Sequence, residues 1–292
     1  MCSKKHAYCI IAYNRPDLLQ NLVEMVDDER NDIYIHIDKK SDISLFSNIK
    51  TEKSYLQFTA KRINCVWGDV SLVYTEMQLF KEAMAHSEYA YVHLLSGMDI
   101  PIKSQDYIHS TLSEGKDLEY IGYLLDASNQ RLLRRRIELY HMFTKEGRSA
   151  LGKVYSWIRR AFCVLQRLVG YKRKHQLEEF GIGPNWATLT GECVKYILSQ
   201  KEVIDREFKY TTCIDEVYKQ SLILNSPFRE KIHQYGKGAL EGCMRLIDWK
   251  RGNPYTYQMK DIDEIMSSDR WFCRKVTDLD LALVIKKRLK RI

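Results

Sequence analysis

Residues 6–38, HAYCIIAYNRPDLLQNLVEMVDDERNDIYIHID, contain two short apolar runs separated by an amphipathic segment. The runs at 6–12 and 33–38 are rich in Ile and Tyr, which is typical of buried β-strands. The segment between them has Asn14 as an expected helix cap, Pro16 in the first turn and apolar residues at helical spacing. This strand–helix–strand order predicts a parallel sheet.

The same alternation continues beyond this opening unit. A further strand is predicted around residues 63–67, a helix over SLVYTEMQLFKEAMAH (71–86) and a buried strand in YAYVHLLSGMDIPI (89–102) that breaks at Ser96 and Gly97. Near-continuous apolar strands alternating with helices predict an α/β sheet covered on both faces. In such sheets, ligands bind beyond the carboxyl ends of the strands. The residues expected near this edge are His36, Asp38, Trp67, Gly97 and Asp99.

The second half of the chain is less regular and strongly basic. Residues 131–174 contain thirteen Lys or Arg against two acids, an excess larger than the net charge of +8 of the whole chain. Within them, residues 153–175 form an amphipathic helix candidate. Its predicted apolar stripe consists of Val154, Trp157, Ile158, Phe162, Leu165, Leu168 and Val169. A second basic cluster, KKRLKRI, occupies 286–292, and such clusters indicate anionic partners: phosphates, nucleic acid or an anionic membrane.

Composition excludes several classes of protein. Hydrophobic content of 45% and charged content of 29% are ordinary for a chain that buries a sizeable core. No apolar run approaches the roughly 20 residues needed to span a bilayer, and MCSKKHAYCIIAYN lacks a signal-peptide pattern. We therefore expect a cytoplasmic protein. Its eight cysteines form no C-x-x-C pair, which argues against a zinc ribbon and favours reduced thiols.

The usual phosphate-binding motifs are missing. The sequence has no G-x-G-x-x-G fingerprint and no P-loop. Metal-dependent sugar transferases usually hold a divalent ion with an Asp-x-Asp pair at a mid-chain strand end, where this chain offers only Asp99. The strings 261–263 (DID) and 278–280 (DLD) lie near the C-terminus and are interpreted as solvated helix faces. If a nucleotide diphosphate binds, cations must replace the metal. The candidates are Arg245, Lys250, Arg251, Arg270, Arg274 and Lys275.

Two adjacent acids stand in TTCIDEVYKQSLILNSPF, residues 211–228. In the local interpretation, Thr212 or Asp215 caps a helix, and an acid in the first turn complements the helix dipole. In the alternative, Asp215 or Glu216 takes part in chemistry. The local pattern leaves both interpretations open.

Eight strings in this order resemble the core-2/I-branching β-1,6-N-acetylglucosaminyltransferase family, which includes peptide O-xylosyltransferases. They extend from about residue 6 to residue 276: AYNRPDLL, YIHIDKKSD, VWGDVSLV, LLSGMDIPIK, GIGPNWATLT, CIDEVYKQSLILNSPF, RLIDWKRGNPYTY and FCRKV. The resemblance implies a GT-A-type α/β fold and an inverting transfer from a UDP-sugar without a metal ion or other cofactor. The chain departs from animal members in lacking their membrane anchor, stem and disulfide pattern, so we expect a bacterial-type member.

The resemblance also implies roles for individual residues. Glu216 is similar to the catalytic base of the family, and Arg245 and Lys275 match the cations that hold the UDP diphosphate. The other implied donor contacts are Asp38 near the ribose, Trp67 beside the uracil and Ile11 in the same pocket. The implied acceptor contacts are Glu119, Arg131 and Trp186.

These expectations define one GT-A-like domain over residues 1–292, with a nucleotide-sugar-binding half (1–125) and an acceptor-binding and catalytic half (126–292). The expected reaction moves GlcNAc from UDP-GlcNAc to a hydroxyl of a glycan or lipid-linked glycan in bacterial surface polysaccharide synthesis. The alternatives are xylose or another UDP-sugar, a metal-dependent GT-A transferase making a different linkage, and a protein that binds a polyanion or nucleic acid through its basic patch. The amphipathic helix at 153–175, with 286–292, is expected either to contact an anionic membrane or to present a solvated basic face.

Overall fold

The computed structural model describes residues 4–142, 144 and 150–290. Its main sheet has the strand order β3-β2-β1-β4-β6, and all neighbours are parallel except β4 and β6. The strands of this sheet are β1 (Lys5–Ala12), β2 (Asn31–Ile37), β3 (Tyr55–Phe58), β4 (Tyr89–Ser96) and β6 (Thr188–Thr190). A smaller sheet contains β5 (Ile100–Pro101), β8 (Phe272–Arg274) and β7 (Arg245–Ile247), with β5 antiparallel and β7 parallel to β8.

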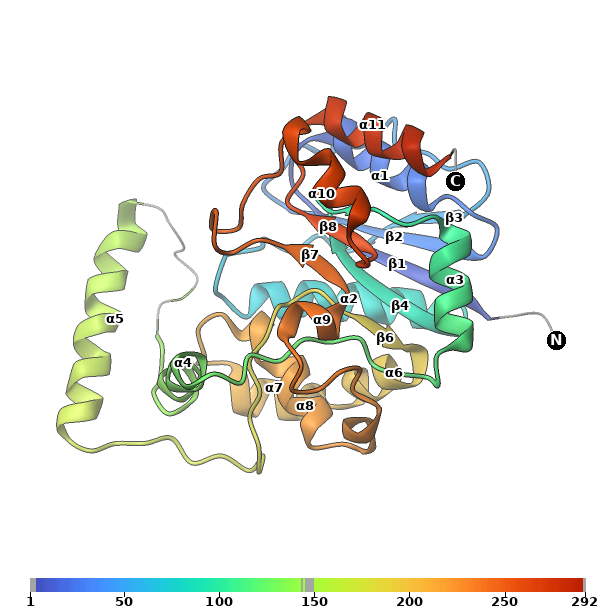
Figure 1. Ribbon diagram of the computed structural model, residues 1–292. Helices are drawn as coiled ribbons and strands as arrows, with labels where there is room; N and C mark the ends of the chain where they lie inside the picture. Colours follow the sequence, from blue (N-terminus) through green and yellow to red (C-terminus); the bar gives the residue numbers. More distant parts are fainter. Residues whose placement is uncertain (1–3, 143, 145–149, 291–292) are drawn as a thin grey trace.

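Helices cover both faces of the main sheet (Figure 1). On one side lie α1 (Pro16–Val26) and α11 (Leu279–Leu289), and on the other lie α2 (Ser71–His86), α6 (Gly191–Ser199) and α8 (Tyr218–Leu224). The remaining helices are α3 (Gln105–Glu114), α4 (Ala127–Ile137), α5 (Ala150–Leu168), α7 (Lys201–Phe208), α9 (Ala239–Cys243) and α10 (Ile262–Ser267). The mostly parallel α/β architecture predicted from the sequence is therefore confirmed.

The alternation of side chains along β1 explains the two cores. Ala7 and Cys9 join the cluster that contains α2, whereas Tyr8 and Ile10 join the cluster that contains α1. Successive side chains of a strand point to opposite faces, so a strand buried on both faces is apolar throughout. This is why an uninterrupted apolar run at 6–12 predicts a central strand.

Three local predictions differ from the structure. Residues 63–67 are not a strand, because the free edge of β2 pairs with β3 instead. The cap position of α1 is Arg15, not Asn14, and it has no side-chain cap. The helix predicted at 153–175 begins at Ala150 and ends at Leu168.

A buried ion pair joins α2 to α8. Lys219 Nζ lies 2.5 Å from Glu76 Oε2, and both side chains are fully buried. Tyr218 donates a hydrogen bond to the same carboxylate at 2.6 Å. The amide of Asn185 donates to Glu76 Oε1 at 2.7 Å and accepts a hydrogen bond from Lys219. Every charged atom of the pair thus has a partner, which is what makes burial of the charges tolerable.

We expect Lys219→Met to lower the free energy of unfolding by about 3–5 kcal/mol, because it leaves the Glu76 carboxylate buried without its counter-charge. The double variant Glu76→Leu/Lys219→Met should recover most of that loss. Urea unfolding at neutral pH measures both.

The matched control is Lys201→Met, which removes the lysine of an exposed pair with Asp205 at 2.6 Å. Its cost should be below about 1 kcal/mol. Equal losses for Lys219→Met and Lys201→Met would contradict a special role for the buried pair.

Candidate active site

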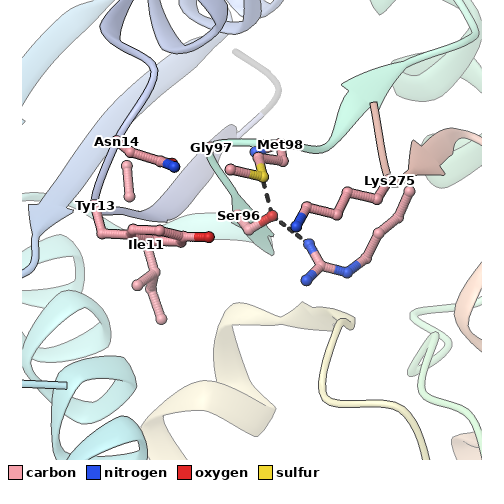
Figure 2. A pocket seen from close by; sticks show the side chains of 9 residues that line it. Ile11, Tyr13, Asn14, Ser96, Gly97, Met98 and Lys275 are labelled. Atoms are coloured by element: carbon pink, nitrogen blue, oxygen red, sulfur yellow. Dashed lines mark hydrogen bonds between the residues drawn. The ribbon is translucent and has the colours of Figure 1, made fainter. Parts of the chain in front are cut away.

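A pocket lies at the carboxyl edge of the main sheet, where β1 and β4 end (Figure 2). Its lining residues are Ile11, Ala12, Tyr13, Asn14, Ser96, Gly97, Met98, Arg274 and Lys275. The turn after β4 approaches β1 closely, since a Cβ atom on Gly97 would lie 2.9 Å from the Cβ of Ala12. Position 97 therefore requires glycine. The pocket lies where open α/β sheets bind ligands, and it contains the predicted donor residues Ile11 and Lys275.

Arg274 is held in place at the mouth of this pocket. Its Nη1 donates to Asp99 Oδ1 at 2.9 Å and also to the hydroxyl of Ser96. Its guanidinium carbon lies 4.4 Å from the ring centroid of Trp186. Asp99, the only acid predicted at this strand end, also accepts a hydrogen bond from Ser96 N at 2.6 Å. Each oxygen of the Asp99 carboxylate thus accepts a hydrogen bond, one from Arg274 and the other from the backbone of Ser96.

Lys275 follows directly and points its amine toward Ser96 (Figure 2). Desolvation lowers the pKa of its ammonium group, the charge of Arg274 lowers it further, and Asp99 opposes the shift. Among the described residues, none forms an ion pair with Lys275. Two neighbouring cations beside one carboxylate give this pocket a positive mouth, which suits an anionic ligand such as a phosphate group.

Arg245 lies elsewhere than predicted. Its side chain is buried, with 1% exposed, and its guanidinium donates to the carbonyls of Cys243 at 2.7 Å and Ala187 at 3.0 Å. It also stacks on Phe272, 4.5 Å from the ring centroid, and desolvation lowers its pKa. The guanidinium ties β7 to β6 in the interior instead of lining the pocket. Arg274, which the sequence analysis left among several candidates, lines the pocket in its place.

Glu216 ends a single 3₁₀ turn, Ile214–Glu216, just before α8. Its Oε2 accepts a hydrogen bond from Arg136 Nη1 at 2.7 Å, yet 37% of its side chain remains exposed. Its backbone carbonyl accepts from Gly183 N at 2.9 Å. The carboxylate is therefore oriented by a cation and still open to a small hydroxyl group.

The capping interpretation of this stretch differs from the structure. The position before α8 is Val217, without a side-chain cap, and the turn before it starts at Cys213, again without one. Neither Thr212 nor Asp215 caps the helix. Cys213 instead has a left-handed backbone conformation, with φ at 49°, directly before the 3₁₀ turn that contains the two acids.

Asp215 and Glu216 occupy different environments although they are adjacent. Desolvation, reinforced by the carboxylates of Glu216 and Glu76, raises the pKa of Asp215 to about 7, and Lys219 opposes the shift. Glu216 has the guanidinium of Arg136 as a direct partner. Its side chain is also partly exposed, so a substrate hydroxyl can reach it. Of the two acids, Glu216 is the better placed to accept a proton.

The two remaining acceptor predictions, Glu119 and Arg131, do not meet Glu216. Glu119 is buried and accepts from Thr190 N at 2.8 Å and Thr190 Oγ1 at 2.6 Å, and desolvation raises its pKa to about 7. It stabilises the corner between β6 and α6. Arg131 is exposed on α4, about 140° around the helix from Arg136. Arg136, at the end of the same helix, is the residue that sequence reasoning missed.

Of the predicted donor residues, Asp38 adjoins the pocket, since its backbone N donates to the carbonyl of Ala12 at 2.9 Å, whereas Trp67 lies in the turn before α2. Asp38 is buried after β2 and accepts from Lys40 N at 2.9 Å, with Lys40 Nζ 3.1 Å away. Trp67 is 66% exposed in the turn before α2. The next residue, Gly68, accepts a hydrogen bond from Cys213 N at 3.0 Å. The turn that carries Trp67 therefore packs against the stretch that carries Glu216.

The segment 183–186 lies between the turn of Glu216 and Arg274. The backbone N of Gly183 donates to the carbonyl of Glu216, and the ring of Trp186 stacks on the guanidinium of Arg274. Between them, Asn185 donates to Glu76 of the buried ion pair. A change in the path of this segment would move the carboxylate and the cations relative to each other. One segment of the chain therefore contacts both the turn of a possible proton acceptor, Glu216, and a cation of the anion-binding pocket, Arg274.

The structure describes no grouping of metal ligands. Among residues 4–142, 144 and 150–290, no three His, Cys, Asp or Glu side chains form a group that could hold a metal ion. In the C-terminal Asp-x-Asp strings, Asp278 caps α11, and Asp263 pairs with Arg288 at 2.9 Å. Asp261 is buried and accepts from Gln258 N at 2.8 Å, so it is not the solvated residue predicted. Both strings stabilise helix starts.

Sequence comparison finds curated proteins that align with most of this chain. Xylosyltransferase 1 of Rattus norvegicus is 20% identical over 92% of this chain, and that of Homo sapiens is also 20% identical over 92%. The chain spans 33% and 28% of these relatives, about a third of their length. A structure of mouse xyloside xylosyltransferase 1 in its apo form aligns with 92% of this chain and 96% of its own at 10% identity and a TM-score of 0.37. Such a score does not establish a shared fold.

The sequence model of the Core-2/I-branching enzyme matches residues 6–269, which is most of the chain and includes Glu216, Trp186 and the pocket turns after β1 and β4. The match ends just before Arg274 and Lys275. The protein belongs to the Core-2/I-branching enzyme family of glycosyltransferases.

Proposed function

We propose that the protein is an inverting glycosyltransferase that moves a sugar from a UDP-sugar to a hydroxyl group without a metal ion. The observation that carries this proposal is that the segment 183–186 contacts both the backbone of Glu216, whose carboxylate is accessible, and Arg274, which lines the pocket together with Lys275. One group would accept a proton from the acceptor, and the others would receive the charge of the leaving diphosphate.

The reaction is a single in-line displacement. The acceptor oxygen forms a bond to the anomeric carbon while the bond from that carbon to the diphosphate oxygen breaks on the opposite face. Because a hydroxyl is a poor nucleophile, Glu216 takes its proton during the attack, a contribution of about 10²–10⁴-fold. Arg136 orients the carboxylate at 2.7 Å. The exposed part of the Glu216 carboxylate would then face the incoming hydroxyl group.

The leaving UDP carries the charge that develops as the sugar bond breaks. Arg274 is fixed by Asp99, Ser96 and Trp186, so it needs little reorganisation when that charge appears. Lys275, which also lines the pocket, adds a second cation. In this proposal the pair replaces the role that Arg245 and Lys275 have in the sequence prediction. Asp38, Trp67 and Ile11 remain proposed contacts for the nucleoside.

The sugar and the acceptor are finer proposals. The resemblance of the sequence to β-1,6-N-acetylglucosaminyltransferases makes GlcNAc the first proposed donor sugar, and the name of the relatives, xylosyltransferase 1, makes xylose the second candidate. We propose a glycan or lipid-linked glycan as the acceptor, in surface polysaccharide synthesis at the cytoplasmic face of a membrane. Thermal shift with UDP-GlcNAc, UDP-xylose, UDP-GalNAc and UDP-glucose would rank the donors.

The polyanion-binding alternative is weakened by how the basic segment folds. Arg136 pairs with Glu216, and Arg173 is buried, with a hydrogen bond from Nη2 to the carbonyl of Glu207 at 2.8 Å. The cations between 131 and 174 therefore do not all contribute to one surface. A nucleic-acid site would need many of them on a shared face.

We expect Glu216→Gln to reduce turnover by at least about two decades while UDP affinity stays near that of the wild type, because the amide keeps the shape but cannot accept the proton. Steady-state kinetics and calorimetric titration with UDP check the two parts. The matched control is Glu179→Gln, which alters an exposed glutamate that also pairs with an arginine, Arg229 at 2.5 Å. If Glu216→Gln turns over as fast as this control, Glu216 is not the base.

We expect Lys275→Ala to weaken UDP binding roughly tenfold or more, the size of one lost charge-assisted hydrogen bond. Lys250→Ala is the control, because Lys250 is exposed and comes from the other cationic string. Calorimetric titration with UDP and with uridine separates diphosphate from nucleoside contacts. An equal affinity of both variants for UDP would remove Lys275 from the diphosphate site.

We expect activity and UDP binding to survive EDTA, because the proposed charge stabilisation comes from Arg274 and Lys275. Turnover measured before and after dialysis against the chelator, with and without added manganese, checks this. Strict dependence on manganese would favour the metal-dependent alternative.

A further inference from the structure

Helix α5 lies at the outer edge of the molecule, beyond α4 (Figure 1). Its apolar residues recur at spacings of three and four, the pattern of one helix face. They are nonetheless exposed to solvent, which is unusual for an amphipathic helix of a globular protein. The exposed fractions are 56% for Val154, 71% for Trp157, 45% for Ile158, 55% for Leu165 and 79% for Leu168.

The opposite face of α5 contacts the body of the protein. Gln166 accepts from Tyr140 N at 2.9 Å and donates to Tyr140 O at 3.0 Å, and the sulfur of Cys163 lies 3.8 Å from His141 Nδ1. At about 100° per residue, Cys163 is about 160° around the helix from Leu165. The polar and small side chains therefore face the protein, and the apolar stripe faces away from it.

The charge of α5 has one sign. The helix sequence ALGKVYSWIRRAFCVLQRL contains four cations and no acid. Lys153, Arg160 and Arg167 are spaced by seven, so they share one side of the helix next to the apolar stripe. The guanidinium carbon of Arg160 lies 5.7 Å from the ring centroid of Trp157. Aliphatic and Trp side chains flanked by Lys and Arg are typical of helices that lie in a membrane interface.

The positive charge of α5 indicates which kind of partner would cover its exposed apolar stripe. A second copy of this chain would bring α5 against α5, and its cations would face cations with no acid on the helix to pair with them. An anionic lipid surface complements the cations and accepts the apolar side chains. None of the described helices is long and apolar enough to cross a membrane. At about 1.5 Å per residue, α5 would cover roughly 28 Å lying flat.

We propose that α5 docks the protein onto an anionic membrane, with its outward stripe inserted among the lipids and its cations at the headgroups. This inference stands independently of the proposed reaction. Of the C-terminal cluster 286–292, which the sequence grouped with this helix, residues 286–289 lie on α11 at another side of the molecule (Figure 1), and 291–292 lie outside the described residues. Lys286 pairs with Glu24, and Arg288 with Asp263, so the proposal rests on α5 alone.

Co-sedimentation of the full chain with vesicles tests the proposal. We expect binding to vesicles of phosphatidylcholine with about one-third phosphatidylglycerol, little binding to phosphatidylcholine alone, and a decrease with salt. Leu165→Glu should reduce binding to the anionic vesicles at least about tenfold, because it removes an apolar side chain that would insert among the lipids and adds charge repulsion. The matched control is Leu45→Glu, at a leucine that is 61% exposed outside α5. It should bind as the wild type does.

A second pair of variants tests the charges. Lys153→Gln should weaken binding about fivefold, whereas Lys116→Gln, at an exposed lysine after α3, should leave it unchanged. Circular dichroism confirms that each variant is folded. No binding of the wild type to anionic vesicles, or equal effects of the α5 variants and their controls, overturns the proposal. So does a dimer in sedimentation velocity that Leu165→Glu dissolves, because the stripe would then be a contact between copies.

Discussion

The buried ion pair between Lys219 and Glu76 is the interaction on which the candidate site depends. It crosses from α8 to α2 and takes in Asn185 from the segment between them. Removing two charges from water is costly, and the protein offsets that cost only with complete pairing and hydrogen bonding. Such a network tolerates one geometry. The network therefore fixes the position of the turn that carries Glu216, directly before α8, and the position of Trp186 beneath Arg274.

A second constraint comes from the edge of the sheet. The carboxyl ends of β1 and β4 lie side by side because Ile11 pairs with Ser96 in the parallel ladder. The small sheet then brings Arg274 and Lys275, from the far end of the chain, to the same edge through the pairing of β5 with β8. Asp99 joins the two parts by its ion pair with Arg274. Metal-dependent transferases use an acid at such a strand end to bind a metal ion. In this protein, Asp99 orients the guanidinium of Arg274 instead.

Features that depend on interactions between residues close in the sequence could be predicted, whereas those that depend on contacts between distant parts of the chain could not. The opening β1–α1–β2 unit and the bounds of α2 depend on local periodicity, and the sequence predicts them closely. Whether Arg245 or Arg274 faces the pocket depends on contacts between two sheets, which no local pattern contains. The burial of Glu119 against Thr190 and the reach of Arg136 to Glu216 are equally long-range. The proposed roles of Glu216 and Lys275 come from the family resemblance, because the local pattern at 211–228 leaves both a helix cap and a chemical role open.

The basic segment 131–174 shows why net charge alone predicts function poorly. Its described cations include three different physical roles. Arg136 orients a carboxylate, Arg173 fills an interior position, and Lys153, Arg160 and Arg167 border the exposed apolar stripe of α5. The amphipathic pattern of α5 is visible in the sequence, but its direction is not. A stripe turned inward would be ordinary core packing. Because the contacts through Cys163 and Gln166 turn it outward, the exposed apolar surface requires a partner, and the one-signed charge of the helix makes an anionic lipid surface the fitting one.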